Sequence, residues 1–316
     1  MLYNRITENL QKKKRSSTDD KRKGLRTKMI HLILNPKAGK RRVKKQVAKV
    51  EKVFDEYGIE WKVHQTEYHG AAKDIARSLT EEDAEATIVV LGGDGTLHEV
   101  LNGVVDPTKC TLGLIPSGTG NDFAAAAGIP EKIEAAAKLI ATTEPKPTDW
   151  LDVGDKRCMN VGGLGMDVDV LIRCEKGKKR GKLKYLKSLL VSFVKFKGYE
   201  VSFECEGEKL DMNGLLVVAC NGKQIGGGIK IFPIADMDDG MMDVMAVQCF
   251  KSKWQTLYAF IQLMSGKIMT YPHKKYYRCK SVSVRPKKAN IVQLDGELYD
   301  DLTFDATVRS GLKFYR

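Results

Sequence analysis

Long apolar runs are missing from this sequence of 316 residues. Stretches such as "LLVSFV" at 189–194 are far shorter than the roughly 20 apolar residues that a helix needs to cross a bilayer. The pattern therefore excludes a membrane-spanning helix and predicts a protein that is either soluble or attached to a membrane surface.

Paired cysteines are missing as well. Seven cysteines are scattered along the chain, and none forms a C-x-x-C pair. An odd number without such pairs indicates neither a zinc knuckle nor a disulfide framework. We expect free thiols in the reducing cytoplasm.

Acidic residues are fewer than basic ones, and the net charge is +13. Residues 1–28 hold ten Lys or Arg and three acids, a balance of +7, which leaves +6 for the rest. This segment has no apolar core of a secretory signal, so we interpret it as a basic, disordered extension before a folded start at Met29. We do not expect nucleic-acid binding. The remaining charge would suit nucleotides or an anionic membrane surface.

Two common phosphate-binding fingerprints are also absent. The loop "GGDGTLHEVLNG" does not fit G-x-x-x-x-G-K-[ST], and neither it nor "GTGNDF" fits G-x-G-x-x-G. A P-loop NTPase and a standard dinucleotide-binding fold therefore lose support.

Residues 29–150 alternate apolar strands with amphipathic helices. Strands are expected at "MIHLIL", "EWKVHQT", "ATIVVL" and "TLGLIP", with helices between them. This order predicts a doubly wound α/β domain, with ligands at the carboxyl ends of its strands. Three loops, "NPKAGK", "GGDGT" and "PSGTGND", lie at such ends, where their N–H and hydroxyl groups could cradle a polyphosphate.

Residues 151–302 have a different texture, with alternating stretches that predict antiparallel strands. We expect a β-rich, sandwich-like domain, with the catalytic cleft between it and the first domain. Two helices interrupt the strands. One spans roughly 180–197, and the other, within 252–266, places four apolar side chains on one stripe: Trp254, Leu257, Ile261 and Met264.

Six motifs occur in one order along the chain: residues 35–40, 92–103, 116–124, 160–170, 221–244 and "LDGE" at 294–297. In these motifs the chain from Met29 onward resembles the soluble bacterial diacylglycerol kinase and lipid kinase family, which is related to sphingosine kinases and more distantly to NAD kinases. Two residues depart from the family pattern. His98 stands where Asn is common, and Ala125 stands where Arg often follows "NDFA".

The resemblance implies an NAD-kinase-like first domain that binds ATP. The implied nucleotide-binding residues are Asn35, Gly39, Lys40, Thr66, Gly92, Gly93, Asp94, Gly95, Thr96, Leu97, His98, Ser117, Gly118, Thr119 and Asn121. For Thr66 the alternative is an ordinary residue at a strand end.

The resemblance also implies a structural Mg²⁺ held by the Asp239 carboxylate and the backbone carbonyls of Asp236 and Met241. Without it, "DMDDG" would be interpreted as an acidic hairpin turn. Asp94, Asp122 and Asp152 form an implied acidic network linked to the metal, since clustered carboxylates near phosphate need a cation to neutralise them.

Glu297, in "LDGE", corresponds to the family's general base, with Asp94 as the second catalytic residue. Phosphoryl transfer to an alcohol needs a carboxylate within hydrogen-bond reach of the acceptor hydroxyl. The alternative is a plain hairpin, because "DG" is a frequent turn pair.

The stretch 176–198 combines an apolar stripe with many basic residues. Leu183, Leu186, Leu190 and Phe193 share one face, and Lys179, Arg180, Lys182, Lys184, Lys187 and Lys195 surround it. Such a helix can lie in an anionic membrane interface. The alternative is a helix packed on the core with a solvated basic face.

These patterns predict a cytoplasmic, peripherally membrane-associated lipid kinase that uses ATP and Mg²⁺, most simply to convert diacylglycerol to phosphatidate. Other acceptors stay open: a sphingoid base, a ceramide-like lipid, an isoprenoid alcohol or phosphatidylglycerol. NAD phosphorylation is disfavoured by the "DGE" and "DMDDG" segments, and a nucleotide-responsive membrane regulator without catalysis is the non-enzyme alternative. Relatives imply a homodimer, and residues 303–316 are expected to pack back onto the first domain.

Overall fold

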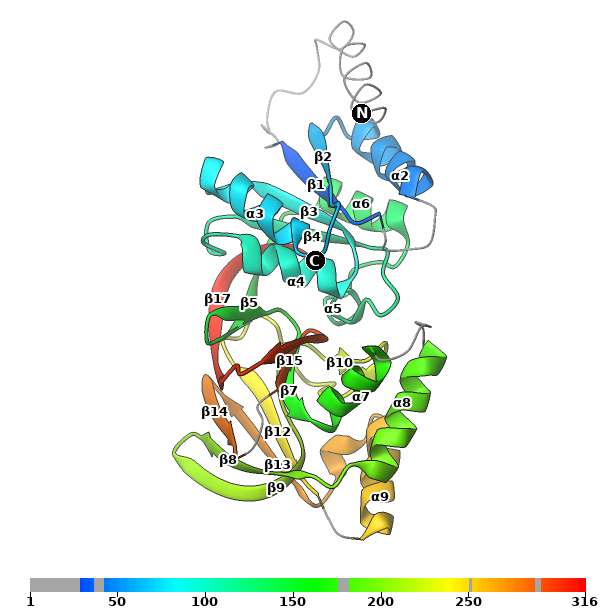
Figure 1. The fold of residues 1–316 in the computed structure, drawn as a ribbon. Coiled ribbons are helices and arrows are strands. Elements are labelled where there is room, and N and C mark those ends of the chain that lie inside the picture. The colour runs from blue at the N-terminus through cyan, green and yellow to red at the C-terminus, as the bar shows by residue number, and fades with distance from the viewer. Residues whose placement is uncertain (1–28, 37–42, 176–181, 250–251, 288–290) are drawn as a thin grey trace, which may run out of the picture.

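The computed structural model describes residues 29–36, 43–175, 182–249, 252–287 and 291–316 (Figure 1). The predictions for residues 1–28, Gly39, Lys40, Lys179 and Arg180 lie outside these ranges. So do the side chains of residues 182–186, which include Lys182, Leu183, Lys184 and Leu186. No helix in the described ranges is long and apolar enough to span a bilayer.

The first part of the chain is a parallel sheet covered by helices. Its strands pair in the order β4, β3, β1, β2, and every pair is parallel. Helices α3 and α4 pack together over one face, and α2 and α6 pack over the other (Figure 1). The bounds are β1 Ile30–Leu34, α2 Val43–Glu56, β2 Trp61–Gln65, α3 Ala71–Glu82, β3 Thr87–Gly92, α4 Asp94–Gly103, β4 Thr111–Pro116, α5 Asp122–Ala126 and α6 Ile133–Thr142.

Burial follows from this layering. Ile88, Val89, Val90 and Leu91 of β3 are all fully buried, because helices cover both faces of a central parallel strand. A continuous apolar run rather than an alternating one is the expected sequence of such a strand.

The second part of the chain is mostly antiparallel. Strands β9, β12 and β7 pair side by side, and α7, α8 and α9 lie to one side of them (Figure 1). The bounds are β5 Lys146–Val153, β6 Lys156–Cys158, β7 Val161–Gly165, α7 Met166–Glu175, α8 Lys182–Lys195, β8 Tyr199–Cys205, β9 Glu208–Cys220, β10 Gln224–Ile225, β11 Ile229–Lys230, β12 Met242–Gln248, α9 Lys253–Met264, η1 Ile268–Thr270, β13 Lys274–Cys279, β14 Ser281–Pro286, β15 Ile291–Leu294, β16 Glu297–Asp300 and β17 Phe304–Tyr315. The α/β plus β fold class is confirmed.

Strand β17 joins the two parts into one sheet. Its first half pairs with β14, and Lys313–Tyr315 run parallel to Thr111–Gly113 of β4. The whole strand also lies antiparallel to β5, with a register shift between Arg309 and Leu312. Gly311, at φ 107°, supplies the backbone conformation that this irregularity requires. Main-chain hydrogen bonds therefore hold the two parts against each other.

Candidate active site

Three loops meet at the carboxyl edge of the parallel sheet. The Asn35 amide after β1 donates to Thr96 Oγ1 in the glycine loop, at 3.1 Å. The Ser117 N–H after β4 donates to the carbonyl of Gly92, the last residue of β3, at 2.8 Å. The strand order thus brings Asn35, the first residue of the "NPKAGK" segment, to the two glycine loops.

The two glycine-containing loops touch through their backbones. A Cβ added to Gly118 would lie 2.6 Å from Gly93 Cα, so a side chain there would push the loops apart. The Asn121 side chain locks the second loop by accepting from the Gly118 N–H at 3.0 Å and donating to its carbonyl at 3.2 Å. The Ser117 hydroxyl is buried and has no partner in the described part of the chain. A buried free hydroxyl between glycine backbones suits a phosphate oxygen.

Asp94 and Asp122 stand together beside these loops. Asp94 accepts the N–H groups of Asp122 and Phe123, both at 3.1 Å, at the start of α5. Burial raises the pKa of Asp94 to about 6, and the charge of Asp122 adds to the shift, although the Phe123 N–H opposes it. Ionised Asp94 is therefore costly unless a cation lies nearby.

Asp122 ties the two parts of the molecule together. Its carboxylate accepts the Gln224 amide at 3.0 Å and the N–H groups of Gly227 and Gly228 at 2.8 and 3.0 Å. These donors belong to the loop around β10 and β11, which carries the fifth motif. Asp122 therefore has a structural partner besides Asp94.

Glu297 lies directly against the glycine loop. A Cβ added to Gly95 would lie 2.9 Å from Glu297 Oε1. Since Gly95 has no side chain, the carboxylate can approach the backbone that follows β3. The first turn of α4 and the hairpin of β15 and β16 thus bring the predicted base to the predicted phosphate loop.

His69 also borders Glu297, which sequence reasoning missed. Its Nε2 lies 4.0 Å from Glu297 Oε2, and its Nδ1 lies 2.9 Å from Glu99 Oε1. Glu99 in turn accepts the Ala72 N–H at the start of α3, at 3.2 Å. The sequence shows His69 at the end of "HQTEYHG", shortly after a strand, but nothing in this stretch indicated that it lies beside Glu297.

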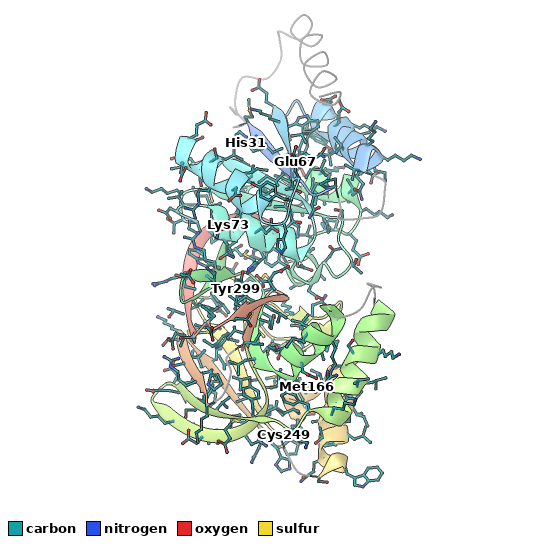
Figure 2. The ribbon with its side chains drawn as sticks, viewed as in Figure 1. His31, Glu67, Lys73, Met166, Cys249 and Tyr299 are labelled. Atoms are coloured by element: carbon teal, nitrogen blue, oxygen red, sulfur yellow. The ribbon has the colours of Figure 1, made fainter. Side chains whose placement is uncertain are left out.

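His98, which departs from the family pattern, makes two side-chain contacts with the hairpin of β15 and β16. Its Nδ1 donates to Asp295 Oδ2 at 2.9 Å, and its Nε2 accepts from the Tyr299 hydroxyl at 2.6 Å. Carboxylates only accept, which assigns the proton to Nδ1. Tyr299 lies where the two parts of the molecule meet (Figure 2). His98 therefore connects α4 to the hairpin that carries Glu297, and its role in nucleotide binding stays a prediction.

Asp295 is the buried centre of this connection. It accepts the Met159 and Asn160 N–H groups at 2.8 Å and the Val161 N–H at 3.2 Å. Burial alone would raise the pKa of Asp295, but the hydrogen bond from His98 and those from these N–H groups outweigh burial and lower it. The carboxylate is thus held ionised without a metal.

The loop predicted to bind Mg²⁺ gathers acids. Asp239 Oδ1 accepts the Met241 N–H at 2.9 Å, and Asp239 Oδ2 pairs with Arg278. A hydrogen bond with Asp238, together with desolvation, raises the pKa of Asp236. Burial raises the pKa of the adjacent Asp149. Among the described residues no group of three or more His, Cys, Asp or Glu side chains is placed to hold a metal ion, so a cation here would depend on backbone carbonyls and on the Asp239 carboxylate, which it would share with Arg278.

The other predicted residues are spread around these groups. Leu97 is buried in α4, Thr119 is exposed, and Thr66 is buried after β2, with its N–H donating to the Leu34 carbonyl at 2.9 Å. Asp152 lies on β5 and accepts from Trp150 at 2.8 Å and from Arg309 at 2.9 Å. The ligand-binding roles of these residues stay predictions. Ala125, on α5, is exposed.

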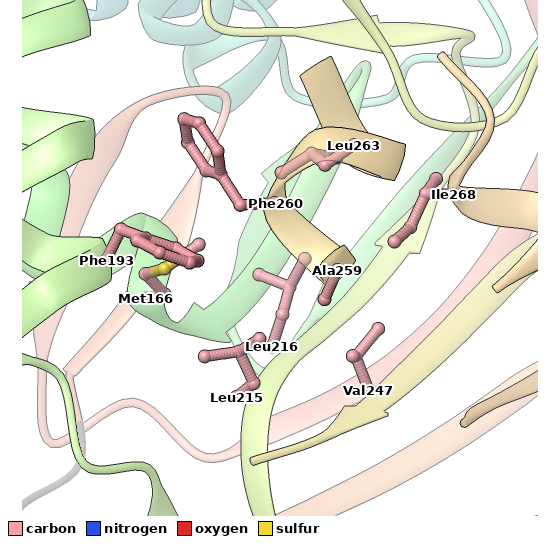
Figure 3. A pocket seen from close by; sticks show the side chains of 9 residues that line it. All are labelled: Met166, Phe193, Leu215, Leu216, Val247, Ala259, Phe260, Leu263 and Ile268. Carbon is pink, nitrogen blue, oxygen red and sulfur yellow. The ribbon is translucent and has the colours of Figure 1, made fainter. Parts of the chain in front are cut away.

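An apolar cavity lies between the sheet of the second part and its helices (Figure 3). Phe193 of α8 and Phe260 and Leu263 of α9 line it, together with Met166. An adjoining cavity shares Met166 and Leu263 and adds the carboxyl of Asp167. Each space measures about 10 Å³, which is room for about one water molecule, so an apolar chain could enter only if these walls moved apart.

Asp167 was also missed by sequence reasoning. Neither of its oxygens has a hydrogen-bond partner in the described ranges. Burial raises the pKa of Asp167 to about 6, and the nearby Val168 N–H and Gln293 side chain only partly offset this effect. An acid within the motif "NVGGLGMDVDV" was the available signal.

Comparisons with known proteins agree with this geometry. Residues 29–153 match the model of the diacylglycerol kinase catalytic domain, and residues 161–312 match the YegS C-terminal NAD kinase beta sandwich-like domain. The chain is 30% identical over 278 residues to a diacylglycerol kinase of Bacillus subtilis (strain 168), covering 85% of this chain and 90% of that protein. The chain belongs to the diacylglycerol kinase family. It is accordingly a lipid kinase.

Further relatives support the family and the fold. A diacylglycerol kinase of Staphylococcus carnosus (strain TM300) is 27% identical over 274 residues, which cover 85% of this chain and 89% of that protein. The crystal structure of a diacylglycerol kinase from Bacillus anthracis str. Sterne superposes with a TM-score of 0.73 at 24% identity. That match covers 92% of this chain and 98% of the other. At this identity the superposition shows the fold alone.

Proposed function

We propose that this lipid kinase transfers the γ-phosphate of ATP to the hydroxyl of diacylglycerol, in a Mg²⁺-dependent reaction at the cytoplasmic surface of a membrane. The observation that supports it most is the Glu297 carboxylate lying against Gly95 of the glycine loop. A base and a phosphate cradle in contact are what phosphoryl transfer to an alcohol requires. The names of the diacylglycerol kinase relatives support the choice of acceptor.

In this proposal Glu297 takes the proton of the lipid hydroxyl while the hydroxyl oxygen bonds to the γ-phosphorus. The bond between that phosphorus and the β–γ bridging oxygen breaks, and ADP leaves with its electron pair. Backbone N–H groups of Gly93 to Gly95, with the Ser117 hydroxyl, bind the phosphates. Bound Mg²⁺ would supply charge neutralisation, with Asp239 and the carbonyls of Asp236 and Met241 as its proposed ligands and Asp94 linked through water.

The test is transfer of radiolabelled γ-phosphate to diacylglycerol in mixed micelles, with and without Mg²⁺. We expect labelled phosphatidate from the wild-type protein and a loss of about 10³-fold or more in turnover for Glu297→Gln. The matched control is Glu99→Gln, a neighbouring glutamate that contacts His69 rather than Gly95, with a far smaller expected loss.

The outcomes separate the alternatives. Label in a sphingoid base, a ceramide-like lipid, an isoprenoid alcohol or phosphatidylglycerol, but not in diacylglycerol, would change the acceptor and keep the mechanism. Near wild-type turnover in Glu297→Gln would remove Glu297 as the base. Nucleotide binding by a folded protein that labels no lipid would favour a regulator.

A further inference from the structure

Helix α9 turns an apolar face away from the protein. Its predicted stripe is exposed, with Trp254 80% and Ile261 52% accessible, and Tyr258 and Met264 also belong to this face. The opposite side of α9 is the packed one: Thr256, Ala259 and Leu263 are buried.

Helix α8 extends this surface. The two helices lie side by side, and the rings of Phe193 and Phe260 pack with centroids 4.7 Å apart (Figure 1). Leu190 of α8 is 48% exposed, while Leu189 is buried. We call Leu190, Trp254, Leu257, Tyr258, Ile261 and Met264 the α9 face. It is a continuous side of α9 plus one residue of α8, and no described residue covers it.

The two segments of chain that carry the α9 face are basic in all their charged residues. Residues 244–294 contain ten Lys or Arg and no Asp or Glu, and residues 176–199 contain nine and none. Among the described side chains, Lys187, Lys195 and Lys267 of these segments are exposed. Aromatic and aliphatic side chains with lysines but no acids are the composition of a helix that lies in an anionic lipid interface.

The same helix reaches the apolar cavity from the other side. Phe260 and Leu263 line the cavity, while Ile261 and Met264, the next residues, are exposed (Figure 3). A lipid that leaves a bilayer at the α9 face would therefore be about one helix diameter from the cavity.

We propose that the α9 face inserts into anionic lipid bilayers and delivers the lipid substrate to the apolar residues beneath it, which must separate to admit an acyl chain; the delivery step rests on the function proposed above. A second copy of the chain is the competing occupant. Two such faces would bring like charges together in an isologous dimer, which is unfavourable, whereas an anionic bilayer complements them.

Trp254 reports directly on insertion. Titration of the full-length protein with vesicles of phosphatidylcholine and phosphatidylglycerol should shift its fluorescence to shorter wavelength, and lipids brominated on the acyl chain should quench it. Trp150 is buried and Trp61 half-buried, so the change should be lost in Trp254→Phe. Pure phosphatidylcholine vesicles should give a weak change. An unchanged spectrum with anionic vesicles would overturn the proposal.

Sedimentation with the same vesicles tests the energetics. The double variant Trp254→Ser, Ile261→Ser should lose about tenfold or more in vesicle affinity. The control Val105→Ser, which removes from the first part of the chain an apolar residue as exposed as Ile261, should bind like the wild type. Equal binding by all three proteins would refute insertion through α9. A wild-type protein that is a dimer in solution, together with a double variant that is a monomer, would also refute it.

Kinase assays separate this proposal from the proposed function. The double variant should keep turnover of detergent-dispersed diacylglycerol and lose it on vesicles. If the wild-type protein inserts into vesicles but labels no lipid, the α9 face is still a membrane-binding surface. The proposed lipid substrate would then be rejected. Equal loss in micelles and vesicles would reject delivery through α9.

Discussion

Two buried acids lie in segments that meet at Glu297: Asp94 begins α4, and Asp295 lies in the turn between β15 and β16. Their environments in the fold differ. Asp94 receives two N–H groups and has Asp122 beside it, and its pKa is raised to about 6. Asp295 receives three N–H groups and His98, and its pKa is lowered. Burial is the largest effect at both residues, so the hydrogen-bond donors decide the direction. The protein's own hydrogen-bond donors therefore stabilise the ionised Asp295, whereas the ionised form of Asp94 needs a cation nearby.

Replacing Asp295 should have the largest effect on stability. Asp295→Ala leaves three N–H groups and His98 Nδ1 without their acceptor, and we expect the free energy of unfolding to fall by about 3–5 kcal/mol. Urea denaturation followed by circular dichroism would measure it. The control is Asp300→Ala, an exposed acid on the same hairpin, for which a change within about 0.5 kcal/mol is expected. A similar small loss for Asp295→Ala would show that Asp295 is not the anchor of the hairpin.

Asp94→Asn should separate activity from stability. The amide keeps the shape but removes the charge that we link to Mg²⁺, so turnover should fall about 10²-fold. Stability at pH 7 should stay the same or rise, because an ionised buried carboxylate is removed. Phosphate transfer and urea denaturation on the same preparation test both. Loss of stability with full activity would reverse the roles assigned to Asp94 and Asp295.

The pH dependence should differ in sign between the two acids. Asp94 binds its proton more tightly in the folded protein, so its contribution is present at about pH 4 and is lost as the pH rises through about 6, a change of at most about 3 kcal/mol. Asp295 holds its proton less tightly when folded, so its contribution is present above the unfolded pKa and is lost as the pH falls below 3.8. Without nucleotide or Mg²⁺, Asp94→Asn should therefore exceed the wild-type stability by more at pH 7 than at pH 4. If the stability difference between Asp94→Asn and the wild type is the same at both pH values, the raised pKa of Asp94 is contradicted.

His98→Asn, which introduces the residue common in the family, should have the smallest effect. The shorter side chain loses the Tyr299 bond, so we expect a loss of about 1 kcal/mol of stability. Because His98 positions the Glu297 hairpin, turnover should fall while the apparent affinity for ATP stays constant. Tyr299→Phe is the matched variant and should reproduce most of the loss. A changed ATP affinity in His98→Asn would instead place His98 at the nucleotide.

Much of the site could be predicted because its residues lie in short, ordered motifs. Gly93 and Gly118 follow strands whose parallel order predicts their meeting, and the structure brings them into contact. Glu297 could be predicted from "LDGE" only through the resemblance, since a turn has the same local pattern. His69 and Asp167 were missed because their importance depends on neighbours far along the chain.

The sequence by itself determined the order of strands and helices, the fold class and the loops of the site, because periodicity and glycine placement act over a few residues. Only the tertiary structure decided the partners of its charged and apolar groups. It placed His98 on Asp295 and Asp122 on the Gly227 loop, and it turned the stripe of α9 outward. An apolar stripe shows that a helix has a face to cover, but whether protein covers it depends on packing between distant segments.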